Sequence, residues 1–257
     1  DVMAAASKFW GWGREDQGVS DEETVFLARL FGQRFDANLV PRAGPKEGDF
    51  ELKPPRLAPP PALERICTSE KRERLVHAYG KSFPDYVRMF QRKVPAPPDV
   101  VAFPESESDV FAVLDWAARA KAAVIPFGGG SSVVGGVECD VGDGYSGAIS
   151  LDMTRMGRVV EIDRASRAAR IEAGALGPEL EAQLKPHGLT LRHFPQSFEF
   201  STLGGWIATR SGGHYATLYT HIDDFVEALR VITPSGLLQS RRLPGSGAGP
   251  QPERLFI

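Results

Sequence analysis

The sequence predicts an α+β fold in which two α/β subdomains follow a helical N-terminal segment. Three observations lead to this expectation. A strand–helix–strand pattern runs from Val100 to Ile125, and a pattern typical of antiparallel strands follows Asp152. Prolines crowd residues 41–61 and 95–98, which interrupt and end the helical first part. We therefore divide the chain into an N-terminal segment, 1–94, and a domain, 95–257, with subdomains at about 95–155 and 156–257.

Composition narrows the class of protein. The 257 residues, 42% hydrophobic and 25% charged, are typical of a soluble globular protein, and the net charge of −3 argues against a nucleic-acid partner. The longest uncharged stretch, Ala122–Val137, is too short and too rich in glycine to span a bilayer. Neither Cys67 and Cys139 nor the five histidines have metal-binding spacing. We expect no transmembrane segment, no metal, reduced thiols and a cytoplasmic location.

The N-terminal segment alternates between helical and irregular stretches. Lys8–Gly13 alternates aromatic residues with glycine, which is typical of an irregular segment held by its rings. A helix is expected over Ser20–Phe31, because Ser20 and Glu23 form a capping-box pattern before an apolar face. We expect an extended linker over 41–61, a second helix over Ala62–Ala78 and a connection over 79–94.

The next elements form one unit. Val100–Phe103 reads as a strand, Ser106–Asp109 caps a helix, and Ala122–Ile125 reads as the next strand. A right-handed crossover is expected between the strands. Such units bind ligands at the carboxyl ends of their strands.

Antiparallel structure follows. Strands are expected at Val159–Ile162 and Ala169–Glu172, around a turn at 163–167. The remaining expected elements are a helix that begins at Gly177-Pro178 and ends at Gly188, a short helix over Leu203–Arg210, and a hairpin of Phe225–Ile232 with Leu237-Leu238.

A glycine-rich loop, Pro126–Glu138, leaves the second strand of the unit. It holds five glycines and the adjacent hydroxyls of Ser131 and Ser132. Because glycine lacks Cβ, consecutive N–H groups can converge into a nest for a phosphate or diphosphate. The loop has no Lys or Arg, so its attraction for an anion would come from dipoles. The same glycines also fit a connection that binds nothing.

Other phosphate loops are excluded. Gly80-Lys81-Ser82 has the ending of a P-loop, but Leu75 stands where its first glycine belongs. Gly142–Gly147 matches GxGxxG, yet it leads into a strand, Ala148–Asp152, rather than a helix, so we interpret it as a surface hairpin.

A second dense stretch, Gln196–Gly213, contains the N-cap candidates Ser201 and Thr202 before Gly204-Gly205. A helix N-terminus there would favour negative charge. Together with the glycine-rich loop, this stretch predicts one extended, anionic, partly planar ligand between the two subdomains.

These stretches, followed by Tyr219–Phe225 and Val231–Gly236, resemble the FAD-binding domain of the vanillyl-alcohol-oxidase and para-cresol-methylhydroxylase (PCMH) superfamily. Within it, the chain resembles the alkyldihydroxyacetonephosphate synthase family, including at Lys8–Gly13. The resemblance implies a PCMH-type fold, and FAD as the cofactor. It implies that the FAD diphosphate is wrapped by Pro126, Phe127, Gly128, Gly129, Gly130, Ser131 and Ser132. It implies that the flavin and its phosphoribityl chain are lined by Gln196, Ser197, Phe198, Glu199, Phe200, Ser201, Thr202, Thr209, Arg210, Ser211 and Gly212.

Three positions qualify this assignment. Gln196 replaces the acidic residue that the resemblance leads one to expect. Glu199 and Arg210 fit a local ion pair as well as a ligand role. His214 follows a loop that resembles that of berberine-bridge-type oxidases, whose histidine bonds to flavin, but it lies far from the phosphate loop. We therefore expect non-covalent FAD.

The resemblance also implies an activity, the exchange of the acyl group of acyl-dihydroxyacetone phosphate for a fatty alcohol without net redox change. Two alternatives stay open: a FAD-linked oxidase or dehydrogenase of a hydroxy acid or alcohol, and a non-catalytic flavin-binding subunit. The resemblance is compatible with a lipid or other small-molecule substrate, with peripheral membrane contact and with a homodimer. Related proteins continue with another FAD loop and a cap domain beyond the point matching Glu253–Ile257, so we expect the cap to be absent and name no catalytic residue.

Overall fold

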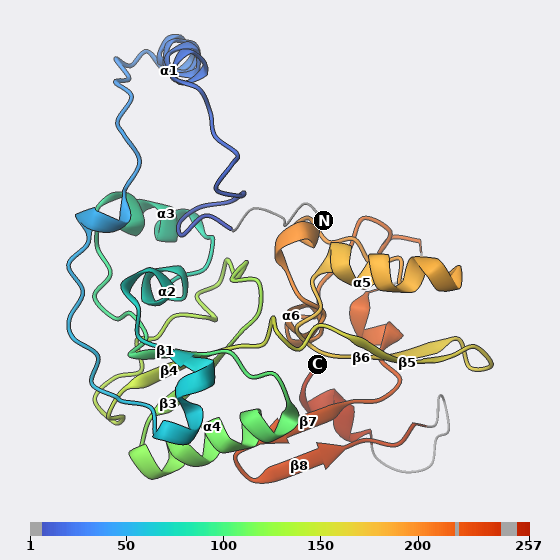
Figure 1. The fold of residues 1–257 in the computed structure, drawn as a ribbon. Helices are drawn as coiled ribbons and strands as arrows, with labels where there is room; N and C mark the ends of the chain where they lie inside the picture. The colour runs from blue at the N-terminus through green and yellow to red at the C-terminus, as the bar shows by residue number, and fades with distance from the viewer. Residues whose placement is uncertain (1–6, 219–220, 243–250) are drawn as a thin grey trace.

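The computed structural model describes residues 7–218, 221–242 and 251–257. Its central sheet has the order β1-β2-β4-β3 and consists of β1 (Cys67–Thr68), β2 (Val100–Ala102), β4 (Ala148–Asp152) and β3 (Ala123–Phe127). Strands β2, β4 and β3 are parallel, and β1 pairs with β2 in the antiparallel sense (Figure 1). Every residue of β4 is buried, as expected of the central strand of a parallel sheet.

The expected strand–helix–strand unit is β2–α4–β3, with α4 (Glu107–Ala120) along the sheet (Figure 1). The Ser106 side chain caps α4 by accepting a hydrogen bond from the Asp109 N–H. Val113 and Ile149 are completely buried in the core that α4 forms with the sheet. The two strands of the unit are not neighbours, because the later strand β4 lies between them.

The N-terminal part differs from expectation in two places. The single helix expected over Ala62–Ala78 is wrong, because the chain forms a 3₁₀ helix (Pro61–Ile66), then β1, then α2 (Lys71–Val76). Cys67 and Thr68 pair with the edge of the sheet, which no local pattern specifies. The connection expected over 79–94 contains α3 (Phe83–Phe90), whose signal is the reciprocal capping box of Ser82 and Asp85.

The aromatic rings of the first segment hold it to the body, as expected. Phe9 packs edge-on against Phe50, and Trp10 packs against Tyr86 and Phe90. The helix expected at Ser20–Phe31 is α1 (Asp21–Phe35), and Ser20 with Glu23 makes the capping box. Figure 1 shows α1 at the tip of two long extended segments, away from the rest of the molecule.

The other four strands of the described chain form two antiparallel hairpins, as expected, although the strand expected from Phe225 begins only at Arg230. The first consists of β5 (Val159–Asp163) and β6 (Ala168–Ile171), and the second of β7 (Arg230–Thr233) and β8 (Gly236–Gln239). The helices of this part are α5 (Gly177–Leu184), which Gly188 terminates after a further 3₁₀ turn, and α6 (Leu203–Ala208). The surface hairpin expected at Gly142–Gly147 is wrong, because the strand that follows it, β4, runs parallel to its neighbours.

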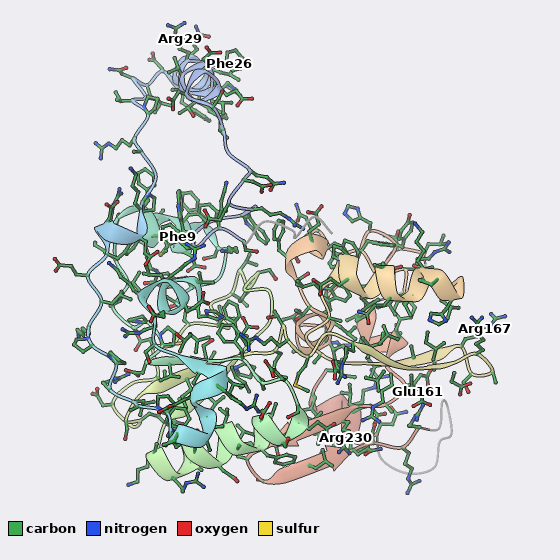
Figure 2. The ribbon with its side chains drawn as sticks, in the orientation of Figure 1. Phe9, Phe26, Arg29, Glu161, Arg167 and Arg230 are labelled. Carbon is green, nitrogen blue, oxygen red and sulfur yellow. The ribbon has the colours of Figure 1, made fainter. Side chains whose placement is uncertain are left out.

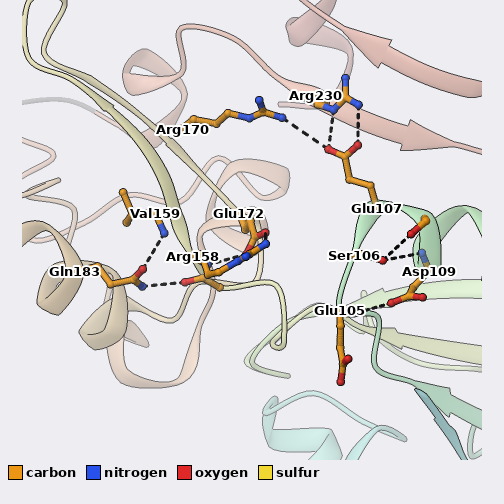
Figure 3. Close-up of polar contacts among 12 residues, drawn as sticks. Glu105, Ser106, Glu107, Asp109, Arg158, Val159, Arg170, Glu172, Gln183 and Arg230 are labelled. Carbon is orange, nitrogen blue, oxygen red and sulfur yellow. Dashed lines mark hydrogen bonds and ion pairs between the residues drawn. The ribbon is translucent and has the colours of Figure 1, made fainter. Parts of the chain in front are cut away.

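An ion-pair cluster joins the two hairpins to α4 (Figure 3). The Glu107 carboxylate accepts two hydrogen bonds of 2.7 Å from Arg230 on β7 and lies 3.8 Å from Arg170 on β6. The hydrogen bonds from Arg230 lower the pKa of Glu107. The predicted domain boundaries near residues 95 and 156 stay predictions.

Candidate flavin-binding site

The glycine-rich loop begins where β3 ends, at the carboxyl edge of the sheet. Phe127 pairs in register with Asp152 at the end of β4, and Gly130 adopts a left-handed φ of 67°. Among the residues that the structure describes, no group accepts a hydrogen bond from the main-chain N–H groups of 128–132. The Ser132 hydroxyl oxygen accepts bonds from the N–H groups of Val134 and Gly136, so its own proton can still be donated. The loop thus presents a run of unused donors, as an anion nest requires.

The second predicted stretch packs directly on this loop. A Cβ on Gly128 would lie 2.2 Å from Thr202 Oγ1, and a Cβ on Gly129 would lie 1.8 Å from the Phe200 carbonyl oxygen. Glycine is therefore required at both positions for the two segments to approach. The structure brings residues 128–129 and 200–202 together at one place.

A buried histidine packs against the start of the glycine-rich loop. His77 is 1% exposed, and its Nε2 lies 2.9 Å from Asp152 Oδ2. Its ring centroid lies 4.2 Å from that of Phe127, whose ring in turn occupies the space next to Gly130. Asp152 also accepts hydrogen bonds from Thr154. His77 therefore fixes the start of the loop, and among the described residues it belongs to no group of side chains able to hold a metal.

Lys81 lies against the far end of the loop. Its main-chain N–H donates to the Ser132 carbonyl oxygen at 2.7 Å, and Gly80 packs so closely that a Cβ would lie 2.1 Å from the same oxygen. Burial lowers the pKa of Lys81 to about 8, and the nearby carboxylate of Asp85 opposes that shift. The sequence pattern gives no sign of a cation here, because Lys81 stands out only as part of an incomplete P-loop motif.

The N-terminus of α6 does not form an anion site. The N–H groups of Leu203 and Gly204 donate to the carbonyl oxygens of Ala175 and Ala173 at 2.9 and 2.8 Å. Thr202 caps the N–H of Gly205. The hypothesis that this helix end attracts the anion is therefore wrong, since its first donors are already satisfied. Gly204 serves packing, because a Cβ there would lie 2.8 Å from the Ala173 side chain.

Ser201 connects this segment internally. Its hydroxyl oxygen accepts a 2.7 Å hydrogen bond from Trp206 Nε1, and its proton is donated to the Ser197 carbonyl oxygen at 2.8 Å. The side chain is 4% exposed. Its hydrogen bonds therefore fix the shape of 197–206.

Arg210 has a partner other than the one considered from sequence. Its guanidinium donates to Asp223 Oδ2 at 2.7 Å, and this bond lowers the pKa of Asp223. The local Glu199–Arg210 ion pair is therefore wrong. Part of the motif that resembles the family, Tyr219-Thr220, lies outside the described residues.

A cavity of about 490 Å³ adjoins the second stretch. It is lined by Trp12, Gly13, Gln17, Phe194, Pro195, Gln196, Phe198, Glu199, Phe200 and His214. Four of these, Gln196, Phe198, Glu199 and Phe200, are sequence-predicted site residues, whereas the glycine-rich loop is not part of the lining. The lining has four aromatic rings and no Lys or Arg, so it suits a neutral planar group better than a phosphate.

Sequence reasoning missed six residues of the lining, namely Trp12, Gly13, Gln17, Phe194, Pro195 and His214. The Trp12 N–H donates to Tyr86 Oη at 2.6 Å, and its ring lies edge-on to Phe200 at 6.0 Å. The aromatic–glycine pattern of Lys8–Gly13 indicated a pinned segment but not what it faces. Only the fold brings this segment to the 194–200 stretch.

The described part of the chain offers neither a metal site nor a reactive thiol. It contains no group of three or more His, Cys, Asp or Glu side chains able to hold a metal. Burial raises the pKa of Cys67 to about 11 and that of Cys139 to about 12, so both thiols are protonated near neutral pH. None of the described helices has the length and apolar character needed to cross a membrane.

Comparisons with known proteins agree with this geometry. A family model described as an FAD binding domain matches residues 98–240. The chain is 41% identical over 180 residues to alkyldihydroxyacetonephosphate synthase of Dictyostelium discoideum, covering 70% of this chain and 29% of that protein. It is 31% identical over 197 residues to the uncharacterized FAD-linked oxidoreductase YgcU of Escherichia coli (strain K12), covering 76% of this chain and 39% of that protein.

A solved structure of an alkyldihydroxyacetonephosphate synthase matches with a TM-score of 0.84 and 31% identity, over 98% of this chain and 50% of that chain. The chain thus spans half of that structure and less than two fifths of these two curated relatives. The predicted fold class is confirmed. The chain belongs to the FAD-binding domain family, with the PCMH-type fold of the alkyldihydroxyacetonephosphate synthases that it resembles.

Proposed function

We propose that this chain holds FAD non-covalently and forms the flavin-binding portion of an enzyme that exchanges the acyl group of acyl-dihydroxyacetone phosphate for a fatty alcohol. The observation that carries the proposal is the run of unused N–H donors at 128–132, packed against 200–202. The similarity to alkyldihydroxyacetonephosphate synthases supports the choice of reaction.

The residues present fit two chemically different parts of FAD, the diphosphate and the flavin ring. The N–H groups of 128–132, with the hydroxyls of Ser131 and Ser132, are suited to the diphosphate. Lys81 borders this loop through its main-chain N–H, and its side chain would supply a positive charge that the loop itself lacks. The aromatic cavity beside Gln196–Phe200 suits the flavin ring. By the family resemblance, Thr209–Gly212 would flank the phosphoribityl chain.

The flavin, when bound, supplies an electron-accepting ring that carries the difficult chemistry. The chain contributes binding and orientation. Its nest would fix the diphosphate, and the rings of Trp12 and Phe200, which lie edge-on to each other in the cavity lining, would border the bound flavin. Within the described cavity lining, Glu199 and His214 are the ionisable side chains, and we assign neither a proton-transfer role.

His214 makes the non-covalent proposal directly testable, because it lines the cavity. Acid precipitation of the yellow protein should leave the flavin in the supernatant. A pellet that stays yellow would contradict non-covalent binding, and loss of that colour in His214→Ala would identify the attachment.

The activity is tested by incubating the FAD-loaded enzyme, of which this chain forms the flavin-binding portion, with acyl-dihydroxyacetone phosphate and a radiolabelled fatty alcohol. Label should enter the dihydroxyacetone phosphate product while the flavin spectrum ends unchanged. The second candidate, a FAD-linked oxidase or dehydrogenase, is favoured by the similarity to a FAD-linked oxidoreductase. Flavin bleaching by a 2-hydroxy acid, without incorporation of label, would support it instead.

Two further proposals concern the setting of the enzyme. An acyl chain and a fatty alcohol reside in membranes, so we propose a cytoplasmic protein that contacts the membrane peripherally. We also propose a homodimer. Vesicle flotation and sedimentation test these proposals separately.

A further inference from the structure

The helix α1 carries apolar side chains that contact no core. It has no buried residue, and Phe26 and Phe31 are 63% and 47% exposed. Figures 1 and 2 show α1, with Phe26 and Arg29, at the tip of its two connecting segments, away from the other elements. Exposed apolar groups gathered on one helix are typical of an interaction surface.

These side chains form one stripe along the helix. Phe26 and Leu30 are four residues apart, as are Leu27 and Phe31, so both pairs lie on one face. Glu23 lies one turn before Leu27, and Arg34 lies one turn after Leu30. The apolar stripe therefore carries a negative charge at one end and a positive charge at the other. Arg29 lies on the opposite face.

The order of residues in the stripe is self-complementary. If a second α1 lies antiparallel on this face, with a two-fold axis between residues 28 and 29, Phe26 faces Phe31 and Leu27 faces Leu30 of the other copy. The same axis places Glu23 opposite Arg34 at both ends. One alignment thus matches the apolar and the charged positions together.

The side chains of Glu23 and Arg34 can both form this contact. Glu23 uses one carboxylate oxygen, Oε2, to accept the Ser20 N–H at 2.8 Å, which leaves the other oxygen available. Among the described residues, Arg34 has no ion-pair partner. A parallel pair would instead oppose like charges at both ends.

We propose that α1 pairs antiparallel with α1 of a second copy of this chain, through Phe26, Leu27, Leu30 and Phe31 with Glu23 opposite Arg34. This inference gives the proposed homodimer its contact and does not depend on the flavin chemistry. An anionic membrane surface fits the helix less well, because its first turn is acidic, with Asp21, Glu22 and Glu23.

Charge reversal tests the alignment. Sedimentation equilibrium of the purified protein should show a dimer, and Glu23→Arg or Arg34→Glu should each raise its dissociation constant about tenfold, since each places like charges together twice. An equimolar mixture of the two variants should recover the dimer, because each Arg then faces a Glu. Recovery would not follow from fraying of the helix alone. Arg29→Glu, on the opposite face, is the matched control and should sediment like the unchanged protein.

Flavin content, measured by absorbance, is the independent readout, and it should stay the same in all of these variants. Failure of FAD binding would contradict the proposed function but not this pairing. A wild-type monomer at all concentrations, or dimers equally strong in every variant, would overturn the pairing. The pairing would also be overturned if the unchanged protein were a monomer that binds anionic vesicles and the α1 variants lost this binding. Lipid would then be the occupant of the stripe.

Discussion

A Cβ placed on Gly129 would lie 1.8 Å from the carbonyl oxygen of Phe200. This contact is how the glycine-rich loop and the 196–202 stretch, far apart in sequence, form one site. No side chain at position 129 fits without moving one of the two segments.

Gly129→Ala should separate the two segments and weaken FAD binding by about a hundredfold, equivalent to roughly 3 kcal/mol, because the N–H groups lose their shared direction. Titration followed by flavin fluorescence measures the change. The control is Gly144→Ala, where a Cβ meets nothing within 4 Å. Equal FAD affinities for the two variants would contradict the role of the close approach.

Lys81 should make FAD binding depend on pH. Its pKa is lowered to about 8 by burial, so it loses its charge as pH rises through that value. An anion bound nearby would stabilise the charged form and move this transition upward. We expect FAD affinity to fall above pH 8 in the unchanged protein and to be lower and nearly flat in Lys81→Met. The same pH profile in both proteins would exclude Lys81 from the site.

Without FAD, the free energy of unfolding should change with pH in the opposite direction to FAD affinity. The unfolded lysine has its ordinary pKa of 10.5, so between pH 8 and 10.5 the unfolded state binds more protons than the folded state. Burial of Lys81 therefore destabilises the fold at low pH, and the free energy of unfolding should rise across this window. Urea unfolding at several pH values measures it, and the rise attributable to this group should be missing in Lys81→Met.

Trp12 should contribute to binding although it lies in the N-terminal segment. Trp12→Ala removes one wall of the cavity, and loss of one aromatic contact costs about 1 kcal/mol, or roughly a fivefold lower FAD affinity. Phe83→Ala removes an aromatic ring that is 81% exposed, and it should change nothing. If both variants bind FAD like the unchanged protein, the cavity is not part of the flavin site.

Glu107 should stabilise the attachment of the hairpins to α4. Glu107→Gln weakens its bonds to Arg230 and Arg170, and a partly exposed pair of this kind is worth about 0.5–1 kcal/mol. Its pKa is lowered, so this contribution is present above the ordinary pKa of 4.5 and is lost as pH falls below it. Chemical denaturation should show the loss at pH 7 and no difference at strongly acid pH. Glu64→Gln, on an exposed side chain, should be neutral at pH 7.

Local patterns in the sequence were enough to predict most elements of the domain. Alternation, caps and turn residues gave α4, β3, β5, β6 and the β7–β8 hairpin. They failed where a distant strand decided the outcome, as at Cys67 and Thr68, which join the edge of the sheet. The α3 helix was missed even though Ser82 and Asp85 carried its local signal.

Part of the site was predictable because its signal also lies in a local stretch of sequence. Glycine spacing indicated the nest, because the property lies in the backbone of one loop. The satisfied N-terminus of α6 was not predictable, since its acceptors, Ala173 and Ala175, lie some thirty residues earlier. The same holds for Trp12 and His214, which only the fold brings to the cavity.

The central claim is that the main-chain N–H groups of 128–132 hold the diphosphate of FAD. Amide NMR of nitrogen-15-labelled protein titrated with FAD tests it most directly. We predict large downfield shifts for the amide protons of Gly128, Gly129 and Gly130, with little change at Gly204, whose N–H already donates to Ala173. Saturation with FAD that leaves the three loop amides unmoved, or that moves the Gly204 amide instead, would contradict the account.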